Sequence, residues 1–255
     1  MNDADSLQQL LREVVEGAVS ALGRASDLRA SGERRGQYAL DLLVDEPMVA
    51  SLLDHGLGVL SEEAGVIEPR RRLVAVIDPV DGSTNASRGI PWYNTSICVL
   101  DDEGPLVSIV ENLVTRDRFE AVRGGGATQN GVAMAAPTPG DIASGIVAVN
   151  GIPPVLNPWA QFRTLGASAL DISYVASGAL DAYVDCADEA HGVWDYLGAL
   201  LVCRELGVLI EDAFGRELVH RDHVARRTPV VAHDAATLRS LIQLRQSFQP
   251  NTDIV

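Results

Sequence analysis

The sequence predicts a layered α/β protein, of the α+β kind, with two lobes. Helical and strand segments alternate after residue 140, whereas the part before it contains clustered strands without that alternation. This pattern favours two layered lobes over a regular Rossmann arrangement. Pro137, Pro139 and Gly140 mark the change. We therefore expect an N-terminal lobe over residues 1–140 and a C-terminal lobe over 141–255.

Periodicity and composition predict the elements of the N-terminal lobe. An apolar stripe with helical spacing runs from Leu7 to Leu22. The segment LVAVI, residues 73–77, is apolar throughout, which is typical of a strand buried on both faces. Pro47 fits the first turn of a second helix. The remaining expected elements are that helix, over 47–54, and strands over 57–60, 96–100, 106–110 and 119–122, with a hairpin between the second and third strands.

Glycines end two of the helices expected in the C-terminal lobe. Gly178 follows a helical segment over 165–177, and Gly207 follows one over 194–206. The other expected elements are strands over 146–149, 180–184, 208–210 and 229–232 and a final helix over 235–246.

Composition excludes several chemistries. All 20 basic residues are Arg, so a lysine Schiff base, a pyridoxal phosphate anchor and a GK[ST] phosphate loop are impossible. With 35 acidic residues the net charge is −15, which disfavours nucleic-acid binding and favours cations. The three cysteines form no CxxC pair, and the apolar runs are far shorter than a membrane span. We expect a cytoplasmic protein without a nucleic-acid or membrane partner.

The most informative stretch is DPVDGSTN, residues 78–85, directly after the apolar segment 73–77. Its two carboxylates, Asp78 and Asp81, lie three residues apart at a strand end. Crowded carboxylates must bind a proton or a cation, and Mg²⁺ prefers carboxylate, carbonyl and phosphate oxygens. The SerThrAsn that follows is typical of a helix start, whose free amides can bind an anion. The motif predicts a site for Mg²⁺ and phosphate; its simpler alternative is an Asx turn with a capped helix.

Three other polar segments are candidates. Glu62 and Glu63 follow the expected strand 57–60, where the alternative is a solvated loop. Asp195, after Trp194, opens a helix, where an Asp is often only a cap. His220 and His223 form an HxxH pair without a third ligand, which favours a surface turn over a metal site.

Together these segments resemble the inositol monophosphatase family of Mg²⁺-dependent, lithium-sensitive phosphatases. That family has a Glu-Glu pair, then DP(I/V)DG(T/S)TN after a strand, then a Trp-Asp at a helix start. Residues 124–131, GGGATQNG, are similar to its GxGAxxNG hairpin. The resemblance covers roughly residues 38–215. It implies an αβαβα sandwich and a homodimer.

The resemblance also implies a two-metal site. Glu62, Asp78 and the carbonyl of Val80 would hold the first Mg²⁺, and Asp78, Asp81 and Asp195 the second. In the family an early acidic segment holds a third, loosely bound Mg²⁺. Here that segment is residues 38–45, which keep its final acid, Asp45, and lack its Thr.

Catalytic and substrate roles follow from the same resemblance. Ser83, at the family's Thr position, would act with Glu62 to orient and activate the attacking water beside Asp81. The amides of Gly82 and Ser83 would bind phosphate. Ser61 stands where the family usually has Gly. The implied substrate contacts are Gly82, Ser83, Thr84, Asp185 and Asp195.

The expected function is therefore Mg²⁺-dependent hydrolysis of a small phosphorylated alcohol, with inositol monophosphate as the default substrate. Histidinol phosphate, fructose 1,6-bisphosphate and 3′-phosphoadenosine compounds are alternatives. A bisphosphate would require an additional Arg near the pocket, and the sequence alone places none there. A non-catalytic regulatory protein on the same fold is the alternative from another class.

Overall fold

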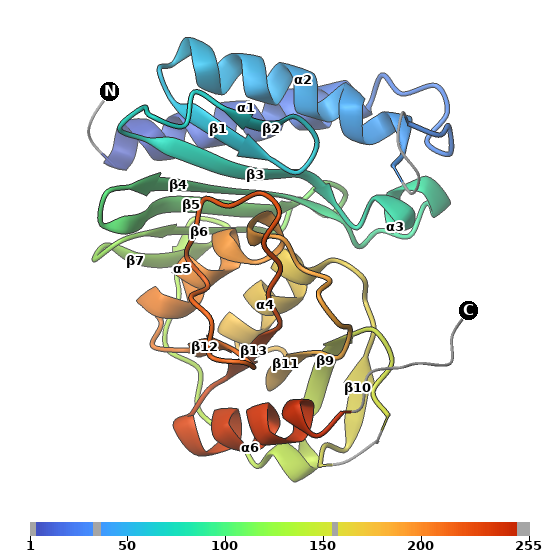
Figure 1. Ribbon diagram of the computed structural model, residues 1–255, viewed down its shortest axis with the longest axis vertical. Coiled ribbons are helices and arrows are strands. Elements are labelled where there is room, and N and C mark those ends of the chain that lie inside the picture. The colour runs from blue at the N-terminus through green and yellow to red at the C-terminus, as the bar shows by residue number, and fades with distance from the viewer. Residues whose placement is uncertain (1–3, 33–36, 155–157, 249–255) are drawn as a thin grey trace.

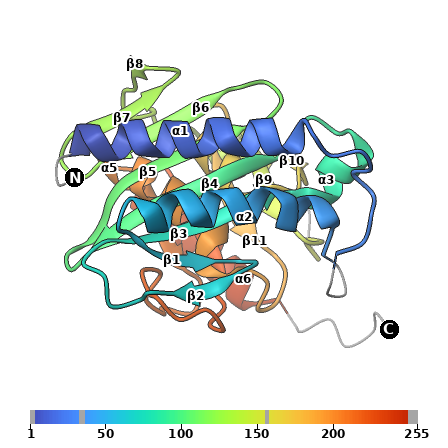
Figure 2. The same ribbon diagram turned by 90° about the horizontal axis from the view of Figure 1, so that it is seen from above.

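The chain folds into five alternating layers of helices and sheets. Figure 1 shows α1 and α2 above an eight-stranded sheet, α4 and α5 between that sheet and a five-stranded sheet, and α6 below. Figure 2 shows α1 and α2 side by side across the upper sheet. The predicted αβαβα sandwich is confirmed. The structure, a computed structural model, describes residues 4–32, 37–154 and 158–248.

The helices are amphipathic or buried elements between these layers. Among the described residues, no helix combines the length and the apolarity that crossing a membrane requires. The helices are α1 (Ala4–Leu22), α2 (Ala39–Asp54), α3 (Ser83–Arg88), α4 (Ser168–Ala176), α5 (Leu197–Glu205) and α6 (Ala235–Gln246), with 3₁₀ turns over Ile142–Ser144 and Val193–Asp195.

The eight-stranded sheet has the order β2-β1-β3-β4-β5-β6-β7-β8. β1 and β3 are parallel and the other neighbours are antiparallel. Because β1 and β3 are parallel and Ser61 is paired with Ile77, the carboxyl-terminal ends of the two strands lie side by side. The strands are β1 (Gly58–Ser61), β2 (Gly65–Ile67), β3 (Val74–Asp81), β4 (Asn94–Asp101), β5 (Gly104–Asn112), β6 (Arg118–Val122), β7 (Gly126–Gln129) and β8 (Val132–Ala133).

The five-stranded sheet has the order β10-β9-β11-β13-β12, with β10, β9 and β11 parallel. The boundary expected near residue 140 falls between the two sheets. One hydrophobic cluster nevertheless includes Val76 of the upper sheet and Val231 of the lower sheet, so the division into two lobes stays a prediction. The strands are β9 (Ile146–Asn150), β10 (Gln161–Arg163), β11 (Ala182–Asp185), β12 (Leu209–Asp212) and β13 (Pro229–Ala232).

Two helices and four short strands differ from the sequence-based expectation. α2 begins at Ala39, eight residues before the expected start, and Pro47 lies inside it. At the start of α2, the Tyr38 amide donates to the Asp41 carboxylate (2.9 Å). Pro47 has no N–H to donate to the Leu43 carbonyl four residues earlier, and Leu43 is an exposed residue. The helix expected over 194–206 begins as a 3₁₀ turn. β2, β7, β8 and β10, with two to four residues each, are too short to show a pattern.

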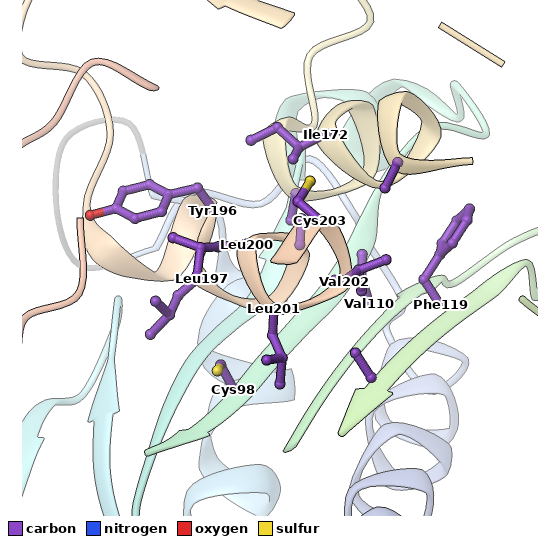
Figure 3. Packing of buried hydrophobic residues seen from close by; sticks show 14 of the residues in the cluster. Cys98, Val110, Phe119, Ile172, Tyr196, Leu197, Leu200, Leu201, Val202 and Cys203 are labelled. Atoms are coloured by element: carbon purple, nitrogen blue, oxygen red, sulfur yellow. The ribbon is translucent and has the colours of Figure 1, made fainter. Parts of the chain in front are cut away.

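α5 packs closely on the upper sheet. Figure 3 shows Leu201 of α5 pointing toward Cys98 of β4, and Cys203 toward Ile172 of α4. A Cβ atom on Gly198 would lie 2.7 Å from the Ser96 hydroxyl oxygen and 3.0 Å from a methyl carbon of Val110. α5 can therefore approach the sheet only because residue 198 has no side chain.

We expect Gly198→Val to lower the free energy of unfolding by about 1–3 kcal/mol, because the added methyl groups overpack the contact between α5 and β4. Urea unfolding measures this change. Arg204→Val, on the exposed side of the same helix, is the matched control, and an equal loss in both variants would contradict the packing argument.

Candidate metal centre

The parallel pairing of β1 and β3 brings two acidic segments to one edge of the upper sheet. The Glu62 amide donates to the Ile77 carbonyl (3.2 Å), so Glu62 continues the pairing just beyond β1. Asp78 lies beside it on β3, and its Oδ1 accepts from the Val80 amide (3.1 Å). The pairing between β3 and β4 is irregular between Asp78 and Asp81, and it resumes with Asp81 opposite Asn94.

Three carboxylates converge at this edge. Oxygen atoms of Asp78, Asp81 and Asp195 all lie within 4.8 Å of one another. Asp195 arrives from the 3₁₀ turn before α5, and its Oδ2 accepts from the Gly192 amide (2.6 Å). Hard oxygen donors at this spacing, in a buried setting, fit Mg²⁺.

Burial raises the pKa of every acid in this group. Burial, and then the charge of Asp195, raise the pKa of Glu62 to about 9. Burial, and then the charge of Glu62, raise the pKa of Asp78 well above its ordinary value. Burial is also the main cause that raises the pKa of Asp195 to about 7. These carboxylates repel one another, and a bound divalent cation relieves that repulsion.

Asp81 is held by groups from two other elements. Its Oδ2 accepts from Asn94 Nδ2 (2.8 Å) and from the Ala169 amide (2.8 Å), and its Oδ1 accepts from the Ser168 amide (3.1 Å). The two amides are at the start of α4, so the C-terminal half of the chain orients this carboxylate. Burial raises the pKa of Asp81, whereas these hydrogen bonds act in the opposite direction.

The turn after β3 depends on Gly82 and Asn85. Gly82 has a φ of 88°, and a Cβ atom there would lie 3.0 Å from the Gly166 carbonyl oxygen. Asn85 Nδ2 donates to the carbonyls of Trp92 and Leu165 (2.7 Å each). The start of α3 is thereby fixed against the second half of the chain.

Comparison with known proteins gives a consistent result. Residues 5–249 match the inositol monophosphatase family model. A fructose-1,6-bisphosphatase of Pyrococcus furiosus is 30% identical over 205 residues, 80% of each chain, and a Nus factor SuhB of Pasteurella multocida is 30% identical over 78% of this chain and 81% of its own. A Pyrococcus horikoshii structure, titled a hypothetical protein with similarities for inositol-1 monophosphatase, superposes with a TM-score of 0.85 at 21% identity, covering 97% of this chain and 100% of its own.

This chain belongs to the inositol monophosphatase family. The predicted resemblance is confirmed, and the chain is a phosphatase of this metal-dependent family, whose members act on small phosphorylated substrates.

The structure brings together the acids that the sequence predicted. Asp78, Asp81 and Asp195 form the cluster, and Glu62 lies close enough to alter the pKa of Asp78. Val80 is buried between the two Asp residues of its motif. The individual metal-binding and catalytic roles of these residues, and those of Gly82, Ser83 and Thr84 in the turn, stay predictions.

Asp185 lies in a different setting from the one expected for a substrate contact. It is fully buried. Its Oδ1 accepts from Asn150 Nδ2 and from the Ala187 amide (3.0 Å each), and its Oδ2 pairs with His191 Nδ1 (2.9 Å). A direct bond to substrate, which stays a prediction, would require these contacts to open.

His191, in the acidic loop after β11, has a supporting role that the sequence did not predict. Its Nε2 lies 2.6 Å from the Ser168 hydroxyl and 2.9 Å from the Tyr183 hydroxyl. The buried pair of Asp185 and His191 thus supports Ser168, whose amide in turn binds Asp81. Burial alone lowers the pKa of His191, but the contact with Asp185 raises it to about 9. A histidine two residues after the acidic stretch 185–189 was the only available signal.

Ser61, the departure from the family's Gly, is fully buried and connects α2 to the turn after β1. Its hydroxyl donates to Asp45 and accepts from the amides of Glu63 (3.1 Å) and Ala64 (3.3 Å). Asp41, an acid to which the sequence analysis assigned no role, lies nearby on α2, and burial raises its pKa to about 7. A third ion at this segment stays a prediction.

Without Mg²⁺, the protein should lose stability as the pH rises from 3.8, the ordinary Asp value, to about 9, the pKa of Glu62. The sign follows because acids with a raised pKa bind more protons in the folded state than in the unfolded state.

At 100 times its Kd, Mg²⁺ should raise the free energy of unfolding by about 2.7 kcal/mol. Asp78→Asn should flatten the pH dependence and abolish stabilisation by Mg²⁺ in thermal unfolding, whereas exposed Asp102→Asn should do neither. Stabilisation by Mg²⁺ that persists in Asp78→Asn would contradict the assignment.

The pair of Asp185 and His191 should give a second pH signature. A histidine with a raised pKa stabilises the fold fully below pH 6.5, its ordinary value, and this contribution is lost as the pH rises through about 9. In metal-free buffer, the advantage of the wild type over His191→Gln in urea unfolding should therefore shrink by up to about 3 kcal/mol over this range. A difference that does not depend on pH would show that His191 contributes by packing alone.

Proposed function

We propose that this phosphatase uses Mg²⁺ to hydrolyse small phosphorylated alcohols, and that inositol 1-phosphate and fructose 1,6-bisphosphate are the first substrates to test. The convergence of Asp78, Asp81 and Asp195 beside the turn that starts α3 is the observation that supports it most strongly. Relatives named fructose-1,6-bisphosphatase, some of them also inositol-1-monophosphatase, support the same substrate class.

In this proposal Glu62, Asp78 and the Val80 carbonyl hold one Mg²⁺, and Asp78, Asp81 and Asp195 hold a second. When bound, Mg²⁺ neutralises phosphate charge and lowers the pKa of a coordinated water. The number of ions, the homodimer and the cytoplasmic location are proposals that rest on the family resemblance.

The protein groups then divide the remaining work. Glu62, which is partly exposed, accepts a proton from the attacking water, and the Ser83 hydroxyl orients that water. The amides of Gly82 and Ser83 face the phosphate at the turn that the positive φ of Gly82 creates. No step requires a lysine, in agreement with the composition.

A non-catalytic role is the alternative, because some relatives are named Nus factor SuhB. The site retains its acids, and the net charge of −15 disfavours contact with RNA. Catalysis is therefore the better-supported proposal.

Phosphate release should be measured from inositol 1-phosphate, fructose 1,6-bisphosphate, histidinol phosphate and 3′-phosphoadenosine 5′-phosphate, with and without Mg²⁺ and Li⁺. We expect turnover that needs Mg²⁺ and falls with Li⁺. Asp81→Asn should lower kcat by more than about 100-fold, the upper end of what losing an outer-shell partner costs a metal site.

Asp102→Asn, in the exposed hairpin between β4 and β5, is the control of the same chemistry and should keep wild-type activity. Full activity in Asp81→Asn would remove this carboxylate from the mechanism. Binding of Mg²⁺ without release from any of the four esters would redirect the search to other esters, and neither binding nor release would favour the regulatory role.

A further inference from the structure

The long loop between β12 and β13 is attached to both sides of the metal centre. His223 Nε2 lies 3.1 Å from the Ser61 carbonyl oxygen and 3.3 Å from the Glu62 carbonyl oxygen. Because both partners are acceptors, Nε2 carries the proton and donates it. Farther along the loop, the Arg227 amide donates to the His191 carbonyl (2.9 Å). The loop therefore lies across the edge where the acids meet.

Trp194 is the surface on which this loop rests. The ring of His223 packs on it with centroids 4.8 Å apart, and the guanidinium of Arg226 lies 5.2 Å from the ring centroid. Trp194 directly precedes Asp195 in the chain, and His223 of the same loop contacts the Glu62 carbonyl, so the loop that carries Arg226 borders the metal centre.

Arg226 forms no salt bridge with a carboxylate among the described residues. Within the described ranges, its contacts are the Trp194 ring and the carbonyls of His223 (2.9 Å) and Ala225 (3.1 Å), both through Nη1. Arg216, in the same loop, differs in this respect because it pairs with Asp212 and Glu189. Arg226 is also partly exposed. A guanidinium that is fixed in this way keeps donors available for an incoming anion.

We propose that Arg226 binds a second anionic group of the substrate, distinct from the phosphate that is hydrolysed. This inference rests on the proposed phosphatase function and narrows its substrate class to sugar and polyol bisphosphates and to phosphate esters that carry a carboxylate. The two anion sites are on different elements: the reacting phosphate is assigned to the turn after β3, whereas Arg226 reaches the centre from the β12–β13 loop over Trp194. The net negative charge of the protein otherwise repels a doubly anionic substrate, so the fixed charge of Arg226 has a large effect on which substrates bind.

Fructose 1,6-bisphosphate and fructose 1-phosphate form a matched substrate pair, because they differ only in the second phosphate. Arg226→Met should raise the KM for the bisphosphate by about 10- to 100-fold, the usual cost of losing a hydrogen bond to a charged group, with a much smaller rise for the monophosphate. Arg226→Lys keeps the charge and loses the planar fork, so its KM for the bisphosphate should be intermediate. Arg239→Met, on exposed α6, removes the same charge at a distance and should match the wild type for both esters.

Equal losses for both esters in Arg226→Met would overturn the proposal and show that Arg226 binds the reacting phosphate or only supports the loop. Unchanged constants for both esters would overturn it as well. If the wild type hydrolyses neither ester, the fructose phosphates are removed from the proposed substrates, and the proposed function is then judged by the other esters named above. The assignment is then judged by the rise in Tm that each sugar phosphate causes with Mg²⁺. The bisphosphate should cause the larger rise in the wild type and lose that advantage in Arg226→Met; equal rises in the wild type would refute the second site.

Discussion

Repulsion among buried carboxylates is the interaction on which the arrangement of this molecule depends. The parallel register of β1 and β3 forces Glu62 and Asp78 to lie side by side, and the turn before α5 adds Asp195 to the same small volume. Water would stabilise these charges separately, but Asp78 and Asp81 are buried and Glu62 and Asp195 are only partly exposed. The remaining polar groups of the centre can be understood as compensation: amides of α4 on Asp81, the Gly192 amide on Asp195, and the Val80 amide on Asp78.

The same contacts hold the two halves of the chain together. Asn85 donates to Leu165, and Trp92 Nε1 donates to Asp171 of α4 (2.7 Å). The first turns of α4 therefore contact the first half of the chain in two places. The Ser168 and Ala169 amides bind Asp81 in the metal centre, and Asp171 binds Trp92. A boundary that composition places near residue 140 is crossed by the contacts that matter most for chemistry, and the centre is complete only when both halves are in place.

The sequence predicted those parts of the site that are local in the chain. The motif over 78–85 contains its own turn, its two acids and its helix start, so its chemistry could be inferred without a structure. The pairing of Asp185 with His191 could not, because the depth of a loop below the surface has no sequence pattern. The position of Arg226 depends on the stacking of the β12–β13 loop on Trp194, which is a tertiary contact between residues 32 apart in the chain. The early start of α2 was missed because Pro47 is typical of the first turn of a helix, whereas in this protein it lies inside the helix.

The attachment of the β12–β13 loop has a consequence for how such proteins diversify. His223 binds the chain beneath it through backbone oxygens of Ser61 and Glu62, which every residue type possesses. The loop contributes no carboxylate to the metal cluster, so its residues can change while the hydrolytic machinery stays intact. Substitutions in this single surface segment can therefore alter substrate preference without changing the carboxylates on which catalysis depends.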